Sequence, residues 1–529
     1  MSMNPKPSSP LATRASSHKA LLHLLLGLAI AASLAPASQA FGQAFGQPPL
    51  PGARQTGPQI YNGACASCHG STLEAQTAPS LFSTRLLGLT DQALQERIRN
   101  AHPTRTGPDI RSLYSEGQIF QIATYLRLQK ANLSGRPPFA ADPDGQVIKT
   151  TKQDFRISVV ARGLDTPWAM SFLPDGGLLV TERSGRLRTI SREGVLSPEP
   201  VKGMPKPWVR QDAGFMDVAV HPDNAKNGWI YLSYAEVLAG AEIPPPPPPG
   251  SPTNRAPSPP SMTVLVRGRI RDNTWVDSQV IYRAPAAIYS ASNVHYGSRF
   301  MFDGRGHVFF SLGERGDMRN AQNLSSPLGK IHRINEDGSI PRDNPFTKTP
   351  GALASIWSYG HRNPQGMALD PVSGLMWEAE HGPTGGDEIN IIRKGHNYGW
   401  GVTSMGIQPG IEKTSEPGMD PPVAYFTPTL APSGINFDLN RASPWRNNLL
   451  VAALLGQELL RLEVRDGKII GREVLFNQFG RVRTVVNGPD GRLFVLIQNP
   501  TGAGTGLSLS APTPGMLIRL DPVRAVKGQ

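Results

Sequence analysis

From about residue 150 onward, the chain alternates short apolar runs with turn residues, and helical periodicity nearly vanishes. One unit recurs six times: a short lead-in, a turn rich in Asp, Asn, Gly or Pro, and an apolar run typical of a β-strand. The copies are SFLPDGGLLVTE (171–182), AVHPDNAKNGWIYLSYAE (219–236), RFMFDGRGHVFFSLGE (299–314), ALDPVSGLMWEAEHG (368–382), INFDLNRASPWRNNLLVAAL (435–454) and VVNGPDGRLFVLIQ (485–498). Six similar hairpins predict an all-β, six-bladed β-propeller over residues 154–523, because radial repetition protects strand edges. A β-sandwich is the alternative, although six equivalent hairpins are unusual in that fold.

Residues 41–136 contain segments in which apolar residues follow helical spacing, and we expect a small all-α domain there. TDQALQERIRNA (90–101) can form one helix, and SEGQIFQIATYLRLQ (115–129) can form another. The second begins with a capping box, Ser115 with Gln118. Its apolar residues follow helical spacing: Ile119, Ile122, Ala123 and Leu126.

Two further segments connect or interrupt these regions. Residues 137–153 are rich in Pro, Gly and Asp at their start and are expected to be a linker. Residues 242–261 contain a proline run that cannot join a sheet interior, so we expect an exposed insertion. Docking of another protein on this insertion is the weaker hypothesis.

The N-terminus has the layout of a secretory signal peptide over residues 1–40. Arg14, His18 and Lys19 precede the apolar run ALLHLLLGLAIAASLAPASQA, which ends in a small-x-small cleavage site, Ser38-Gln39-Ala40. The run is short for a membrane span, so we expect export to the periplasm and no membrane span after cleavage. The net charge of +12 is spread along the chain and comes with no nucleic-acid-binding motif, so nucleic acid is not an expected partner.

The only two cysteines lie in YNGACASCHG (61–70), as Cys65 and Cys68, directly before His69. A disulfide or a thioredoxin-like redox site is possible for such a pair, but the second needs a βαβ context that is missing. Cys-x-x-Cys-His is the attachment motif of c-type haem, with both thiols bound covalently and the histidine bound to iron. We therefore predict haem c here.

This region resembles a class I cytochrome c in YNGACASCHG and in its last helix, with the Tyr-Leu pair at residues 125–126. Such cytochromes usually offer a methionine as the distal iron ligand, and residues 70–136 contain none. His102 in AHPTRTGPDI is the nearest residue that can bind iron. We expect His102 as the ligand; an open or water-ligated haem, or a ligand from elsewhere, are the alternatives.

Polar residues collect directly after several apolar strands, so we expect them on loops that meet at one end of the propeller channel. These residues are His295, Arg362, Asn363, Gln365, His381, Arg481 and Arg483. Three arginines repel one another unless they bind an anion, and guanidinium groups pair bidentately with carboxylates. The pattern therefore favours a cofactor that carries several carboxylates.

Over roughly residues 154–523 the chain resembles the soluble pyrroloquinoline-quinone-dependent glucose and aldose sugar dehydrogenases. The motifs are GLDTPWAMSFLPDGGLLVTER, GSRFMFDG, IPRDNPF, YGHRNPQGMA, EHGPTGGDEINIIRKGHNYGW and RVRTV before GPDG. The EHGP form looks closer to the aldose sugar dehydrogenases. The resemblance implies a six-bladed propeller that oxidises a sugar with quinone and calcium.

The resemblance also implies roles for individual residues. His295 matches the base that takes the proton of the anomeric hydroxyl, and Glu314 the carboxylate that orients it. Arg362, Asn363, His381, Arg481 and Arg483 match the groups that hold the quinone. The backbone carbonyls of Gly382 and Pro383 match the ligands of its calcium, and Glu388 with the carbonyl of Tyr398 a second calcium site. Gln211 lies near a family glutamine that binds substrate, but its spacing is off by about one residue.

One position departs from the family: Leu455 stands where a lysine would neutralise a cofactor carboxylate. Together, the two halves predict a periplasmic quinohaemoprotein that oxidises an aldose to its lactone. Electrons would leave one at a time through the haem to an external acceptor. The alternatives are a non-catalytic binding propeller with a haem carrier or sensor, and a dehydrogenase for another alcohol or aldehyde such as sorbosone.

Overall fold

The computed structural model describes residues 57–69, 81, 89, 91–101, 110–133, 140, 142–245, 257–498 and 514–523. The predicted signal peptide (1–40), the proposed iron ligand His102 and the middle of the 242–261 insertion lie outside these residues. None of the helices in the described ranges is long and apolar enough to cross a membrane.

The N-terminal part is helical, as predicted. Its elements are α1 (Gly57–Ile60), the π-helix Tyr61–Cys65, α2 (Ala66–His69), α4 (Asp91–Arg99), α5 (Ile110–Leu113) and α6 (Glu116–Leu133). The capping box at the start of α6 is confirmed, because the Gln118 N–H donates to Ser115 Oγ at 3.3 Å and the Ser115 N–H donates to Gln118 Oε1 at 3.0 Å. Ile122 and Leu126 of α6 form a buried cluster with Ile60 and Tyr61.

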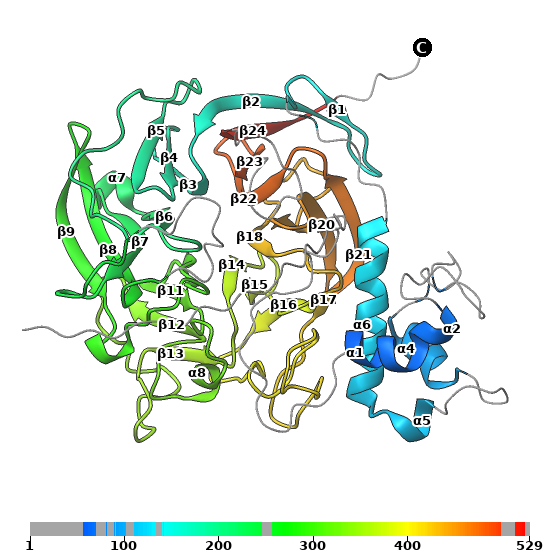
Figure 1. Ribbon diagram of the computed structural model, residues 1–529. Coiled ribbons are helices and arrows are strands. Elements are labelled where there is room, and N and C mark those ends of the chain that lie inside the picture. Colours follow the sequence, from blue (N-terminus) through cyan, green and yellow to red (C-terminus); the bar gives the residue numbers. More distant parts are fainter. Residues whose placement is uncertain are drawn as a thin grey trace, which may run out of the picture. The chain divides into compact units, whose positions relative to one another are not determined.

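The strands of the described chain, which lie between residues 147 and 522, form six antiparallel sheets. Figure 1 shows these sheets arranged as the blades of a ring. The first five are β3 (Pro167–Phe172), β4 (Leu178–Glu182), β5 (Arg186–Ile190); β6 (Phe215–Val220), β7 (Ile230–Val237), β8 (Ser261–Arg271), β9 (Thr274–Tyr282); β10 (Phe300–Phe302), β11 (His307–Leu312), β12 (Lys330–Asn335), β13 (Ile356–Tyr359); β14 (Pro364–Leu369), β15 (Met376–Glu380), β16 (Asp387–Ile392), β17 (Ala424–Phe426); and β18 (Pro432–Phe437), β19 (Leu449–Ala453), β20 (Glu458–Arg465), β21 (Lys468–Phe476). Each of the six predicted hairpins is a pair of neighbouring strands in a different sheet, which confirms the six-bladed propeller.

The sixth sheet joins the two ends of the propeller. Its order is β1 (Val147–Ile148), β2 (Phe155–Leu164), β24 (Gly515–Pro522), β23 (Leu493–Gln498) and β22 (Arg481–Asn487). The pairing of β2 with β24 runs from Phe155 opposite Pro522 to Leu164 opposite Gly515. Strand β1 shows that the sheet already begins within the residues expected to be a linker.

The core consists of apolar clusters between neighbouring blades. Each of the six junctions has one, and every cluster draws residues from both sheets. In the cluster between the fourth and fifth blades, for example, Trp377 of β15 meets Phe437 of β18 edge to face, with ring centroids 5.9 Å apart. Because both faces of a blade are covered, its inner strands can be buried throughout, as in β4 and β19.

A buried ion pair ties several blades together near the channel. Asp217 of β6 accepts hydrogen bonds from Arg299 Nη1 at 3.0 Å and from the Phe300 N–H at 2.6 Å. Arg299 also donates to the carbonyl of Gln365 at 2.8 Å and lies over the ring of Trp168. Burial raises the pKa of Asp217 and lowers the pKa of Arg299, so each charge depends on the other.

We expect the substitution Asp217→Ala to destabilise the protein by about 3–5 kcal/mol, because it leaves the Arg299 charge buried without its partner. The measurement is the denaturant midpoint of unfolding. Asp223→Asn is the control, since Asp223 is exposed and pairs with Lys226 at 3.5 Å on the surface. Equal midpoints for D217A and D223N would contradict the expectation.

Candidate functional site

The shortest contact among the predicted site residues joins the two that were predicted to act together. His295 precedes β10 and Glu314 follows β11, and His295 Nδ1 lies 2.7 Å from Glu314 Oε2. Glu314 also accepts the Gly316 N–H, at 2.5 Å. Burial raises the pKa of Glu314, but His295, Arg362 and the Gly316 N–H together hold it below its ordinary value. An ionised Glu314 keeps the proton on Nδ1, which leaves Nε2 of His295 as the proton acceptor.

The backbone around His295 is in a left-handed conformation that residues other than glycine rarely adopt. His295 has φ 56°, Gly297 φ 65° and Ser298 φ 93°. The segment is held by hydrogen bonds, because the His295 N–H donates to Asp212 Oδ2 at 3.1 Å and the Gly297 N–H donates to Asn363 Oδ1 at 3.2 Å. Gly313 passes so close that a Cβ there would lie 2.3 Å from the His295 carbonyl oxygen. Strain held in this way is common at functional sites.

The three arginines predicted to hold an anion belong to one group. Burial lowers the pKa of Arg362, Arg481 and Arg483, that of Arg481 to about 10. The charges of Arg299 and Arg481 lower the pKa of Arg483 further, and Arg183, which follows β4, adds a fourth positive charge that lowers the pKa of Arg481 and Arg483. Nε of Arg362 and Nε of Arg483 are buried with no hydrogen-bond partner among the described residues. Four cations and these open donors fit an anionic ligand.

His381 and Asn363 lie beside these arginines. Burial, followed by the charges of Arg362 and Arg483, holds the pKa of His381 well below its ordinary value, so His381 is neutral. Its Nδ1 is 3.4 Å from Asn363 Nδ2, and its Nε2 is buried without a partner in the described part of the chain. A neutral histidine can either donate to a ligand or accept from one.

The loop with Gly382 and Pro383 is held in place by Asp387. The Gly382 N–H donates to Asp387 Oδ1 at 2.8 Å, and Asp387 Oδ2 accepts from the N–H groups of Leu430 and Ala431. Burial raises the pKa of Asp387 to about 6 against the effect of these donors. Asp387 therefore acts as a loop anchor, and it leaves the carbonyls of Gly382 and Pro383 for other partners.

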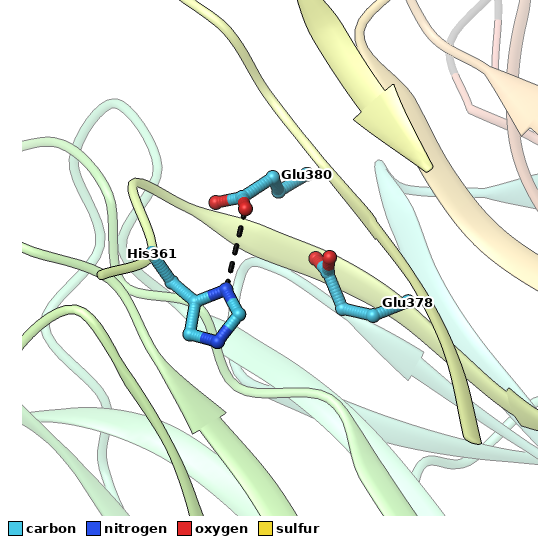
Figure 2. Close-up of side chains that lie close together, drawn as sticks. All are labelled: His361, Glu378 and Glu380. Atoms are coloured by element: carbon cyan, nitrogen blue, oxygen red, sulfur yellow. Dashed lines mark hydrogen bonds and ion pairs between the residues drawn. The ribbon is translucent and has the colours of Figure 1, made fainter. Parts of the chain in front are cut away.

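Next to this loop, three carboxylates gather on one face of the fourth blade. Glu380 pairs in register with Glu388, and Glu378 with Asn390, so all four side chains lie on the same face. Asn390 Nδ2 donates to all three carboxylates, at 3.1 Å (Glu378), 3.2 Å (Glu380) and 3.3 Å (Glu388). We call Glu378, Glu380, Glu388 and Asn390 the carboxylate cluster. Figure 2 shows two of its members, Glu378 and Glu380, with His361, whose Nδ1 is 3.2 Å from Glu380 Oε1.

The carboxylate cluster has more negative charge than its neighbours balance. Burial, and then the charge of Glu380, raises the pKa of Glu378 and of Glu388 well above the ordinary value. Glu378 Oε1 and Asn390 Oδ1 are buried with no hydrogen-bond partner in the described ranges. His361, Glu378 and Glu380 place one ligand atom each within 4.8 Å of one another. The cluster thus fits a cation held by oxygen ligands.

A narrow pocket lies between residues predicted to hold the quinone and the carboxylate cluster. Its volume of about 10 Å³ has room for a single water or ion. Its lining includes Arg362, Glu380, His381, Gly382, Pro383, Glu388 and Tyr398. The residues predicted for the two calcium sites therefore border one small space. Tyr398 is fixed by its hydroxyl, which donates to the Ile391 carbonyl at 2.7 Å, and by stacking on His361.

Gln211 and Leu455 are two further positions that the sequence singled out. Gln211 adopts φ 52°, and its carbonyl accepts a hydrogen bond from Arg183 Nη1. Leu455 lies in the turn between β19 and β20 and is 38% exposed. Sequence reasoning missed Arg183, Asp212, Glu378 and Glu380; Arg183 follows its strand directly, as other site residues do, and this signal could have identified it.

The residues predicted to hold haem lie in short helices of the N-terminal part. Cys65 ends the π-helix, and His69 ends α2 one turn later. Cys65 packs against the buried cluster around Ile60 and Tyr61. The side chain of Cys68 lies outside what the structure describes, as does His102. One helical turn between Cys65 and His69 agrees with the spacing that haem attachment needs.

Comparison with known proteins covers both parts of the chain. The family described as Glucose / Sorbosone dehydrogenase matches residues 164–508, and the family described as Cytochrome C oxidase, cbb3-type, subunit III matches residues 52–126. The aldose sugar dehydrogenase of Escherichia coli is 37% identical over 358 residues, which are 65% of this chain and 91% of that protein. Its apo crystal structure matches with a TM-score of 0.60 and 36% identity, over 70% of this chain and all of that one. Quinoprotein glucose dehydrogenase B of Acinetobacter calcoaceticus is 28% identical over 309 residues, 53% of this chain and 59% of that protein.

Proposed function

The chain belongs to the glucose/sorbosone dehydrogenase family and carries an N-terminal cytochrome c domain, and on this basis we propose that it oxidises aldose sugars at C1 to lactones, with pyrroloquinoline quinone as the first electron acceptor and haem c as the outlet. The observation that carries the proposal is the 2.7 Å contact between His295 and Glu314 beside the buried arginines. A binding module has no need of a base held in this way.

The arginine group supports the choice of cofactor. Arg362, Arg481 and Arg483 would hold the carboxylates of the quinone, because buried guanidinium groups with open N–H donors favour that partner. Asn363 and His381 would complete the polar contacts. Arg183 supplies a cation to the same group and offers a reason why Leu455 can replace the family lysine. When bound, the quinone would accept the hydride that leaves C1.

The chain's own contribution to the reaction is proton transfer and orientation. His295 Nε2 takes the proton of the C1 hydroxyl as hydride departs, so that C1 becomes the lactone carbonyl. Glu314 stabilises the imidazolium that forms, and it keeps the ring oriented through Nδ1. The strained segment 295–298 is fixed by hydrogen bonds from both neighbours, so the base does not have to be ordered by substrate.

Calcium is the cation that we propose for the small pocket. The carbonyls of Gly382 and Pro383 would bind the calcium next to the quinone, where a hard cation polarises the carbonyl that accepts hydride. Glu388 and the Tyr398 carbonyl would bind the second calcium, with Glu378 and Glu380 adding negative charge behind it. Raised pKa values at Glu378 and Glu388 support a cation there, because burial and the charge of Glu380 disfavour the ionised carboxylates and a dication would favour them.

We further propose that electrons leave through haem bound to Cys65, Cys68 and His69, one at a time, toward an external acceptor. Export to the periplasm fits this proposal, because c-type haem is carried by exported proteins and the N-terminus reads as a signal peptide. The distal iron ligand, for which we propose His102, lies outside the described residues.

The test is the visible spectrum of purified protein reconstituted with calcium and pyrroloquinoline quinone, before and after adding aldoses. We expect the haem α-band to appear on sugar addition. A C65S/C68S variant is expected to lose the band and to keep sugar-dependent dye reduction. Dye reduction without haem reduction in the wild type would overturn the internal electron route alone. If neither haem nor dye responds, the propeller is a binding module.

A further inference from the structure

Arg315 is a buried cation that the proton transfer described above does not use. Its Nη1 donates to the Val294 carbonyl at 2.9 Å, and its Nη2 donates to the Ser292 carbonyl. The carbonyl of Ser290 lies 3.4 Å from the same Nη2. The guanidinium therefore supplies hydrogen bonds to an irregular stretch of backbone that leads directly to His295.

The same guanidinium covers the residue that follows the base. Arg315 Cζ lies 3.4 Å from the centroid of the Tyr296 ring, which is a cation–π contact. Tyr296 is buried, and its hydroxyl is 2.7 Å from Ser261 Oγ. Arg315 therefore contacts both chain neighbours of His295, namely Val294 and Tyr296. Because His295 has the unfavourable φ of 56°, its position depends on such contacts from the surrounding structure.

Two consecutive residues hold different parts of the proposed base. Glu314 contacts the imidazole of His295 at 2.7 Å, whereas Arg315 contacts the residues on either side of it. Left-handed φ angles of 62° at Arg315 and 81° at Gly316 turn the chain directly after Glu314. The imidazole and the backbone of the base are thus both fixed from one short loop.

Resting on the proposed function, we propose that Arg315 is a positioning residue, which holds His295 so that Nε2 faces the C1 hydroxyl of the sugar. It acts through the backbone of Val294 and the ring of Tyr296 and takes no part in the proton transfer. Without the guanidinium, the buried Val294 carbonyl loses this donor and the Tyr296 ring loses its cation. Displacing a reacting group by about 1 Å can cost about 100-fold in rate. Arg315 should therefore affect kcat and leave the binding of sugar and quinone unchanged.

The test compares R315M with R333M in protein reconstituted with quinone and calcium. Arg333 is the matched control, because it is also buried and lies over an aromatic ring, that of Trp357 at 5.1 Å. Its side-chain partners Asp343 and Asn344 are not site residues. Both variants lose a buried cation, so both should have a lower denaturant midpoint of unfolding. We expect R315M alone to lower kcat, by about 100-fold, with KM for the sugar and Kd for the quinone unchanged to within about twofold.

The rate is counted per bound quinone, so that unfolded protein cancels from kcat. R315K is the conservative variant: it keeps the charge and a donor for the Val294 carbonyl, but an ammonium cannot lie flat on the Tyr296 ring, so we expect an intermediate kcat. A wild-type kcat in R315M, or an equal loss in R333M, would overturn the proposal, because Arg315 would then only support the fold. If R315M does not fold, a wild-type kcat in R315K would overturn it. No turnover of sugar by the wild type would overturn the proposed function itself.

Discussion

His295→Asn is expected to lower the rate of sugar-dependent dye reduction about 10²–10⁴-fold, the range typical for loss of a general base. The measurement is kcat with saturating sugar in protein reconstituted with quinone and calcium. Asparagine is the right replacement, because it tolerates the φ of 56° that His295 adopts. The loss should therefore report on chemistry and not on a rearranged backbone.

The chain offers a matched control for this variant. His396 also contacts a carboxylate, with Nδ1 2.9 Å from Asp420, but this pair is exposed and neither residue is among the predicted site residues. We expect H396N to retain the wild-type rate to within about twofold, since surface substitutions of this kind cost little. If H295N and H396N have the same rate, His295 is not the base.

Removal of calcium is expected to destabilise the protein, because the carboxylate cluster then lacks the cation that favours its ionised form. A ligand at 1,000 times its Kd stabilises by about 4 kcal/mol, which corresponds to roughly 10 °C in Tm for a domain of moderate size. The measurement is the Tm of quinone-free protein with a chelator and with added calcium.

The pH dependence of this effect follows from the raised pKa values of Glu378 and Glu388. In calcium-free protein the folded state keeps protons that the unfolded chain has released, so these two residues contribute less stability as pH rises through their folded pKa. Calcium needs the deprotonated carboxylates, so its stabilising effect should grow over the same range. E378Q should reduce the difference, whereas E193Q, at an exposed position, should leave it unchanged. A Tm that does not respond to calcium at any pH would contradict a calcium site.

The parts of the fold that sequence could predict are those with local signals. A tight turn between two apolar runs is sufficient to identify the first hairpin of each blade, and a Ser–Gln pair three residues apart is sufficient to identify the start of α6. The carboxylate cluster has no such signal. Glu380 and Glu388 become neighbours only through the register of β15 and β16, which is a property of strand pairing.

In the candidate site, too, some features have a local sequence signal and others arise only from the fold. His295 and Glu314 are 19 residues apart, and their contact was expected only from the family resemblance. Gln211 has φ 52°, and no pattern of residue types reveals that angle. Arg183 was missed because a lone arginine after a strand is usually a surface residue.

The last blade has a consequence for how the protein is made. Its outer strands come from the start of the propeller and its inner ones from the end, since β2 pairs with β24. Joining segments so far apart in sequence has a high entropic cost and slows folding. A nascent chain that has not yet released Gly515–Pro522 from the ribosome lacks the strand that joins β2 to β23. Prematurely ended chains would therefore expose the unpaired edges of β2 and β23. The eight-residue strand β24 thus distinguishes complete molecules from truncated ones, which proteases should degrade.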